Sequence, residues 1–284
     1  MHWGTYEFAG VASRGSGVEE KRNRESHTTR KNSDTRHPTS DTPKGDIMKR
    51  TLLILLLAAA PLRAAGNDAA AVLARADVFR NPIPSFSVDV ELMSVTPDGK
   101  SNTSRFRVYG KGADRSIVEF TYPQTEKGKY LLMLRDAMWI YMPTASRPIR
   151  ISPLQRLMGQ ASNGDVARTN FSADYEARSV AEEGDAYVLD LVARDPAVAY
   201  NRVKLWIDKQ SYEPRRADFY VVSGKLIKRA NYRMYGTMAG RRVVTEVEIE
   251  DLLRPGNRTT MRYANLTPKD NAEKMFTKDS LGKW

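Results

Sequence analysis

Apolar and polar residues alternate one by one through much of the chain between residues 86 and 266. In one such run, Val203, Leu205 and Ile207 alternate with polar and charged neighbours. A period of two is that of a β-strand with one buried face. Short connections such as Ser223-Gly224 join neighbouring strands that run antiparallel. The pattern therefore predicts a mainly β (α+β) fold, a curved antiparallel sheet of about eleven strands with short helices lying against it.

Two segments of this region carry helix signals instead. A helix is predicted from Ala69 to about Arg80, with Asn67 or Asp68 as its N-cap and Asn81-Pro82 ending it. A second, short helix is predicted over residues 154–158, between a proline and a glycine.

Residues 48–65 have the pattern of a secretory signal peptide. Lys49-Arg50 is its positive start, residues 51–60 are its apolar centre, and Ala64 or Ala65 is its small-residue exit. The apolar centre is too short to span a bilayer, which takes about 20 residues. We therefore expect export to the periplasm, with cleavage of this segment.

The 47 residues before this segment are polar and lack the apolar content of a folded core. They are a disordered extension, or their start is mis-annotated and Met48 is the natural first residue. The codons of Lys44-Gly45-Asp46 can contain a ribosome-binding sequence, which favours the second interpretation. In both cases residues 66–284 form the mature domain.

The predicted mature domain contains neither histidine nor cysteine. His2, His27 and His37 all precede the export segment, and the chain has no cysteine. Imidazole and thiolate are the usual general bases, nucleophiles and zinc ligands near neutral pH. Ser-His-Asp, Cys-His and histidine-metal mechanisms are therefore excluded for the mature protein, and no metal or cofactor is expected.

The whole chain carries a net charge of +11, of which residues 66–284 keep +7, and the basic residues are dispersed rather than clustered. Such a surface favours anionic membranes or phosphate head groups. Nucleic acid is not expected as a partner, because the export segment removes the protein from the cytoplasm.

One predicted hairpin, over residues 131–142, is apolar on both faces. Leu132 falls on one face of its first strand, and Leu131 and Met133 fall on the other. Both faces must therefore be covered. The cover of the second face is either another part of the protein or a hydrophobic guest, and flexible methionines are suited to a guest of variable shape.

The same hairpin carries a family resemblance. Residues 131–143 resemble the strand, turn and Trp-x-Tyr-x-Pro pattern of the periplasmic outer-membrane lipoprotein-sorting proteins, the LolA-like superfamily. The elements Arg150-Ile151-Ser152, Met158-Gly159 and Gly164-Asp165-Val166 resemble the segment that follows this pattern in the family. The likeness extends over residues 69–284.

The resemblance implies an unclosed β-barrel capped by helices, whose interior holds acyl chains. It implies a periplasmic carrier or chaperone for lipoproteins or lipids, working between an inner-membrane exporter and an outer-membrane acceptor, without catalytic residues. The residues that we expect to line the hydrophobic cavity are Leu131, Met133, Trp139, Tyr141, Trp206, Tyr220 and Met234.

Two alternatives remain from the sequence. One is a regulatory protein that senses envelope lipids on the same scaffold, which a stable protein partner without cargo transfer would distinguish. The other is a hydrolase that uses neither histidine nor cysteine. Ser280 and Lys283 have the Ser-x-x-Lys spacing of penicillin-binding enzymes, but no helix or companion motif follows them.

Overall fold

The computed structural model describes residues 68–135, 137–167 and 170–283. The predicted signal peptide and the segment before it lie outside the described residues. The helices and strands are α1 (Ala69–Asp77), β1 (Ser85–Val95), β2 (Ser101–Lys111), β3 (Arg115–Tyr122), β4 (Tyr130–Leu134), β5 (Ala137–Tyr141), β6 (Ile149–Ile151), β7 (Arg156–Met158), β8 (Ala161–Ser162), α2 (Asn163–Ala167), α3 (Phe171–Asp174), β9 (Tyr175–Glu183), β10 (Ala186–Ala193), β11 (Arg202–Asp208), β12 (Pro214–Tyr220), β13 (Leu226–Met238), β14 (Arg241–Asp251) and β15 (Arg258–Pro268), with short 3₁₀ helices at Gln124–Glu126, Glu273–Met275 and Lys278–Ser280.

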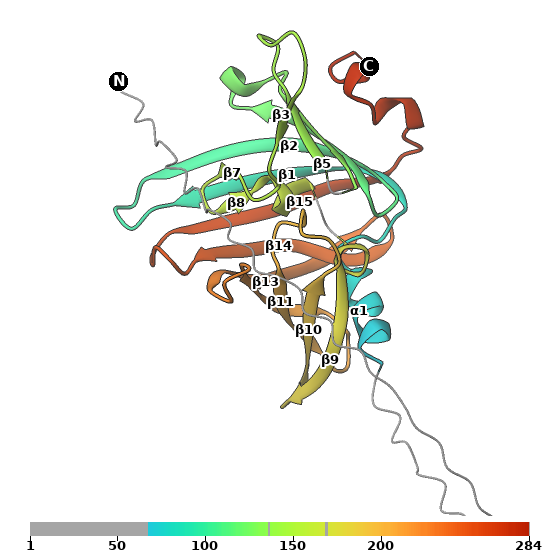
Figure 1. Cartoon of the computed structure of the whole chain (residues 1–284), viewed down its shortest axis with the longest axis vertical. Coiled ribbons are helices and arrows are strands. Elements are labelled where there is room, and N and C mark those ends of the chain that lie inside the picture. Colours follow the sequence, from blue (N-terminus) through green and yellow to red (C-terminus); the bar gives the residue numbers. More distant parts are fainter. Residues whose placement is uncertain (1–67, 136, 168–169, 284) are drawn as a thin grey trace, which may run out of the picture. The chain divides into compact units, whose positions relative to one another are not determined.

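One curved antiparallel sheet of thirteen strands makes up most of the described chain (Figure 1). Its strand order is β6-β5-β4-β3-β2-β1-β15-β14-β13-β12-β11-β10-β9, so the sheet does not close on itself. The predicted mainly β fold with an unclosed sheet is confirmed. The strand number exceeds the predicted eleven, in part because β6 has only three residues and shows no periodic pattern.

The curvature of the sheet has a local cause in its strand pairing. The register shifts within the β1–β15, β2–β3, β9–β10, β11–β12, β12–β13 and β13–β14 pairs. Each such bulge bends its strand and increases the local twist. A sheet with this many bulges curves around one of its faces, and we call the face that packs against α1, α2 and α3 the inner face.

The main core lies on the inner face. Strand β1 alternates strictly between buried and half-buried residues, with Phe86, Val88, Val90 and Leu92 buried. These side chains belong to the same core cluster as Val72 and other residues of α1 to α3. The alternation in the sequence thus marks the buried face correctly.

Helix α1 begins where predicted, since the Asp68 carboxylate accepts a hydrogen bond of 3.0 Å from the Ala70 backbone N–H. It ends at Asp77, three residues before the predicted end at Arg80. The backbone N–H of Arg80 donates to the Asp77 carbonyl in a turn. Beyond Asp77 the chain continues in tighter turns, in which the backbone N–H groups of Phe79 and Arg80 each donate to the carbonyl three residues earlier.

The predicted short helix at 154–158 is wrong. The chain turns at Pro153 and then forms β7, which pairs with β8. Five residues cannot stabilise an isolated helix, and Gly159 after them has a φ of +55°. This left-handed glycine reverses the chain between β7 and β8.

Gly159 also lies in close contact with the sheet. A Cβ atom at this position would lie 2.4 Å from Thr259 Oγ1 and 2.5 Å from Ser94 Cβ. We expect Gly159→Ala to lower the free energy of unfolding by about 2–4 kcal/mol, from left-handed strain and overpacking together. Gly240→Ala is the matched control, because Gly240 has a φ of +70° and open space around it. Urea unfolding of both variants measures the difference, and equal costs would contradict the close contact.

The two faces of the β4–β5 hairpin pack against different parts of the protein. Leu131, Met133 and Met138 belong to the main core on the inner face. Leu132 and Trp139 face the other way and belong to a second cluster. The hairpin is therefore covered on both faces, as its sequence requires.

The cover of this second face is the C-terminal segment (red in Figure 1). Phe276 and Leu281 are 4% and 1% exposed and pack with Tyr109, Ile117 and Leu132. Of the two covers that the sequence left open, the structure places protein on this outer face.

Candidate functional site

An apolar cavity lies between the inner face of the sheet and the α2–α3 region. Its volume is about 90 Å³, measured as the space open to the centre of a water molecule. One water needs only about 10–15 Å³ on this measure. The cavity therefore has room for several connected groups of a ligand.

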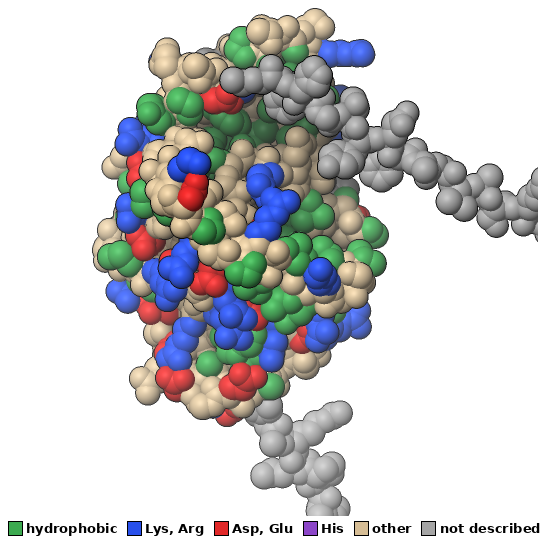
Figure 2. Space-filling view, turned by 90° about the vertical axis from the view of Figure 1, so that its left-hand side faces the viewer, with side chains coloured by type: hydrophobic (Ala, Val, Ile, Leu, Met, Phe, Trp, Pro, Cys, Tyr) green, Lys and Arg blue, Asp and Glu red, His purple; other side chains and the backbone are tan. Residues whose placement is uncertain are grey.

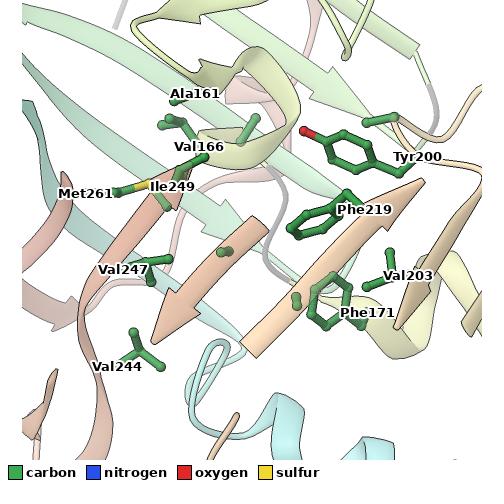
Figure 3. Packing of buried hydrophobic residues seen from close by; sticks show 14 of the residues in the cluster. Ala161, Val166, Phe171, Tyr200, Val203, Phe219, Val244, Val247, Ile249 and Met261 are labelled. Atoms are coloured by element: carbon green, nitrogen blue, oxygen red, sulfur yellow. The ribbon is translucent and has the colours of Figure 1, made fainter. Parts of the chain in front are cut away.

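The sheet side of the cavity is aliphatic. It is formed by inward-facing residues of β1, β14 and β15, which alternate with polar residues on the outer face. Among them are Val88, Val90, Val244, Val247, Ile249 and Met261. Figure 3 shows Val244, Val247 and Ile249 on one side of the core, opposite Phe171 and Phe219. Apart from the Tyr263 hydroxyl on β15, which donates to Met261 Sδ, the side chains of this wall are hydrocarbon or thioether.

The opposite wall is aromatic. The Phe219 ring on β12 lies with its centroid 4.5 Å from that of Tyr200 and 6.4 Å from that of Phe171 on α3. Val166 of α2 also lines the cavity. Because α2 and α3 are only five and four residues long, their position depends on these tertiary contacts rather than on helix propensity.

A buried ion pair ties α2 to the sheet. Lys228 Nζ on β13 lies 2.6 Å from Asp165 Oδ2 on α2, and both side chains are about one-tenth exposed. The Tyr200 hydroxyl donates to Asp165 Oδ1 at 2.9 Å, and the Ser162 backbone N–H donates to Oδ2 at 2.7 Å. Burial disfavours the Asp165 carboxylate, but Lys228 and these hydrogen bonds outweigh it and lower its pKa. This cluster fixes one rim of the cavity.

A second pair of charged residues, Asp77 and Arg80, lies near the end of α1. The Asp77 carboxylate accepts hydrogen bonds from the Phe171 and Ser172 backbone N–H groups at 3.1 and 2.6 Å. Burial raises the pKa of Asp77, and Arg80 opposes this effect. The Arg80 guanidinium lies over the Phe171 ring, with its central carbon 3.9 Å from the ring centroid, and lines the cavity.

The structure places the first four predicted lining residues on opposite faces of one hairpin. Leu131 and Met133 are 1% and 3% exposed on the inner face, and Met133 borders a small hollow of about 20 Å³. Trp139 and Tyr141 are half-buried on the outer face, beside the C-terminal segment. The Lys278 ammonium lies 5.6 Å from the Trp139 ring centroid.

The other three predicted lining residues also lie apart from the cavity. Trp206 on β11 donates from Nε1 to Glu183 at 3.0 Å and is stacked by Arg216 at 3.5 Å. Tyr220 is half-buried on β12, and Met234 on β13 is 56% exposed. None of the seven borders the larger cavity, whose lining residues instead include the valines of β1 and β14.

The outer face of β14 carries the row of carboxylates Glu246, Glu248 and Glu250. Arg262 Nε donates to Glu246 at 2.8 Å, and Asn231 Nδ2 donates to Glu250 at 3.0 Å. Figure 2 shows basic and acidic side chains interspersed over one face of the molecule. These carboxylates thus have basic or amide partners on the solvated side of the sheet and form no acid pair in an apolar pocket.

The described residues also bear on metal binding and on the Ser-x-x-Lys spacing. No group of three or more His, Cys, Asp or Glu side chains among them could hold a metal ion. The Ser280 hydroxyl donates to the Met275 carbonyl at 2.6 Å and belongs to a capping box with Thr277. In the described ranges, no helix is long and apolar enough to cross a membrane.

Comparison with known proteins places the chain in a family. A family model described only as that of an uncharacterized protein matches residues 112–283. No curated protein matches the sequence significantly. Among solved structures, the LolA superfamily protein NE2245 from Nitrosomonas europaea is 37% identical; the match covers 75% of this chain and 99% of that one, with a TM-score of 0.70. The chain belongs to the LolA superfamily.

Two more distant structures share the fold. A DUF1329 family protein from Desulfovibrio piger is 22% identical, with a TM-score of 0.63, over 75% of this chain and 97% of that one. An outer membrane lipoprotein-sorting protein domain from Vibrio parahaemolyticus is 18% identical, with a TM-score of 0.62, over 76% and 100%. The resemblance seen in the β4–β5 hairpin is thereby confirmed at the level of the superfamily.

Proposed function

We propose that this protein is a periplasmic carrier or chaperone that binds acyl chains of lipoproteins or lipids in the apolar cavity and moves them toward the outer membrane. The observation that carries the proposal is the aliphatic and aromatic lining of the cavity. Membership of the LolA superfamily and the fold shared with a lipoprotein-sorting domain support it.

The physical basis of binding is the hydrophobic effect. Each methylene removed from water contributes about 0.8 kcal/mol, so an acyl chain needs no reactive residue to bind. Release needs a partner that offers a better site or stabilises a more open arrangement. An inner-membrane exporter as donor and an outer-membrane acceptor would meet this need. A binding role rather than an enzymatic one also agrees with the residues that line the cavity.

The proposal includes the processing of the chain. Residues 48–65 serve as the export signal, and residues 66–284 are the mature protein in the periplasm. The N-terminal residue of protein recovered from the periplasm, read by mass spectrometry, tests this part. A peptide from residues 1–47 in that protein would contradict it.

Filling the cavity should weaken ligand binding. Val247 is 3% exposed and lines the cavity, so Val247→Trp places an indole where the ligand is expected. Displacing two or more methylenes corresponds to a loss of at least about tenfold in affinity. The measurement is titration with a fluorescent fatty acid.

Val222→Trp is the matched control, because Val222 is 86% exposed. It should bind the fatty acid like the unmodified protein. Circular dichroism verifies that both variants fold, and Val247→Phe replaces the tryptophan variant if that one does not. Unchanged affinity in a folded Val247 variant would contradict binding in this cavity.

A further inference from the structure

Charged side chains interrupt the apolar lining of the cavity. Lys228 and Asp165 lie 2.6 Å apart and neutralise each other. Asp174 also borders the cavity and has interactions of its own. Arg80 differs from them. Among the described residues, the carboxylate that pairs with it is that of Asp77, and this carboxylate lies 3.9 Å from the Arg80 Nη1 nitrogen.

The carboxylate beside Arg80, that of Asp77, already accepts hydrogen bonds from other groups. Asp77 accepts hydrogen bonds from two backbone N–H groups and from the Ser172 hydroxyl at 2.6 Å, which fixes the start of α3. Arg80 Nη1 lies 3.9 Å from Asp77 Oδ1, beyond hydrogen-bond distance. This nitrogen is buried and has no hydrogen-bond partner among the described residues. A buried donor of this kind is costly unless something satisfies it.

Aromatic rings hold the guanidinium in position. Its central carbon lies 3.9 Å from the centroid of Phe171 and 5.9 Å from that of Tyr232. The N–H donors of a guanidinium lie in its own plane. Stacking on a ring face therefore leaves the edge of the group available for an acceptor, and this edge suits the paired oxygens of a carboxylate or phosphate.

We propose that Arg80 binds the oxyanion head of an amphiphile whose acyl chain occupies the cavity. This inference rests on the proposed carrier function and adds the chemical class of the ligand, which is an anionic amphiphile rather than a neutral one. The head is a carboxylate or a phosphate group. Free fatty acids and anionic phospholipids both supply this chemistry.

The experiment compares an acid with its own ester. Binding of cis-parinaric acid and of its methyl ester is measured by fluorescence at neutral pH, in the mature chain and in Arg80→Met. A hydrogen bond to a charged group contributes about 1.5–3 kcal/mol, which corresponds to an affinity ratio of about tenfold to a hundredfold. We expect this preference for the acid in the unmodified protein. In Arg80→Met the ratio of acid to ester affinity should fall to about one.

Two further variants keep the test decisive. Arg254→Met removes an exposed arginine outside the cavity and should retain the preference for the acid. Arg80→Lys keeps the charge and should retain part of it. If Arg80→Met does not fold, the acid-to-ester ratio of the unmodified protein and of Arg80→Lys still decides the matter.

The outcomes separate the two proposals. If neither probe binds the unmodified protein, the carrier function itself is wrong. If both bind equally, or if Arg80→Met weakens them equally, the carrier function stands and the role of Arg80 is structural. Displacement of the bound acid by oleate identifies the carboxylate source, and displacement by phosphatidate but not by phosphatidylcholine identifies the phosphate source.

Discussion

Asp165→Asn is expected to lower the free energy of unfolding by about 3–5 kcal/mol. The substitution keeps the volume of the side chain but leaves the Lys228 ammonium buried without its counter-charge. A buried ion is strongly destabilising when it loses its partner. Because Asp165 is on α2 and Lys228 is on β13, the variant should also loosen the rim of the cavity. Urea unfolding monitored by circular dichroism measures the loss.

The matched control removes both charges. Asp165→Asn combined with Lys228→Met should be closer to the unmodified protein than Asp165→Asn alone, because no buried charge then lacks a partner. The lowered pKa of Asp165 gives a second check. Its contribution is present above the ordinary carboxyl pKa of about 3.9 and is lost as the pH falls through the lower folded-state value. The difference in stability between the unmodified protein and Asp165→Asn should close in that acid range. A difference below about 1 kcal/mol at neutral pH would contradict the role of this pair.

Phe276→Ala is expected to lower the free energy of unfolding by about 3–5 kcal/mol. The phenylalanine is 4% exposed and packs on the outer face of β3 and β4 through Ile117 and Leu132. Removing its ring leaves a cavity in the second cluster, which is small and cannot easily fill the space. The measurement is thermal and urea unfolding.

Two Leu→Ala variants, one at a buried position and one at an exposed position, serve as controls. Leu281→Ala, at a position 1% exposed, should cost about 2–5 kcal/mol. Leu253→Ala, at a position 49% exposed, should cost less than about 1 kcal/mol. Similar small costs for Phe276→Ala and Leu281→Ala would mean that the C-terminal segment does not stabilise this face of the sheet.

The sequence predicts the strands of this protein well because their signal is local. The alternating run Val203, Leu205 and Ile207 lies in β11, where all three side chains are buried and their neighbours are not. Strand β11 has one apolar face, and the period of two marks it without knowledge of the partner strand. The short segment at 154–158 fails for the opposite reason. The conformation of this segment depends on the close contact of Gly159 with β1 and β15, which are distant in the sequence.

The position of the cavity could not be predicted from local patterns. The two-faced hairpin requires two covers, but only the folded chain brings Phe276 to its outer face. Val247 and Ile249 look like ordinary core residues in the sequence, since their alternation does not tell a filled interior from a hollow one. Whether the space beside a valine is filled depends on the curvature of the sheet and on the position of α2 and α3.

The sheet ends at β6 and at β9 and has no ladder joining these two strands among the described residues. In a closed barrel, strand number and stagger together fix the diameter. Here no ring of backbone hydrogen bonds fixes the circumference, so bending at the bulges can widen or narrow the interior while every strand keeps its neighbours. An open sheet of this kind can therefore change the width of its interior without breaking a strand pair, which would suit the proposed binding of ligands of different size.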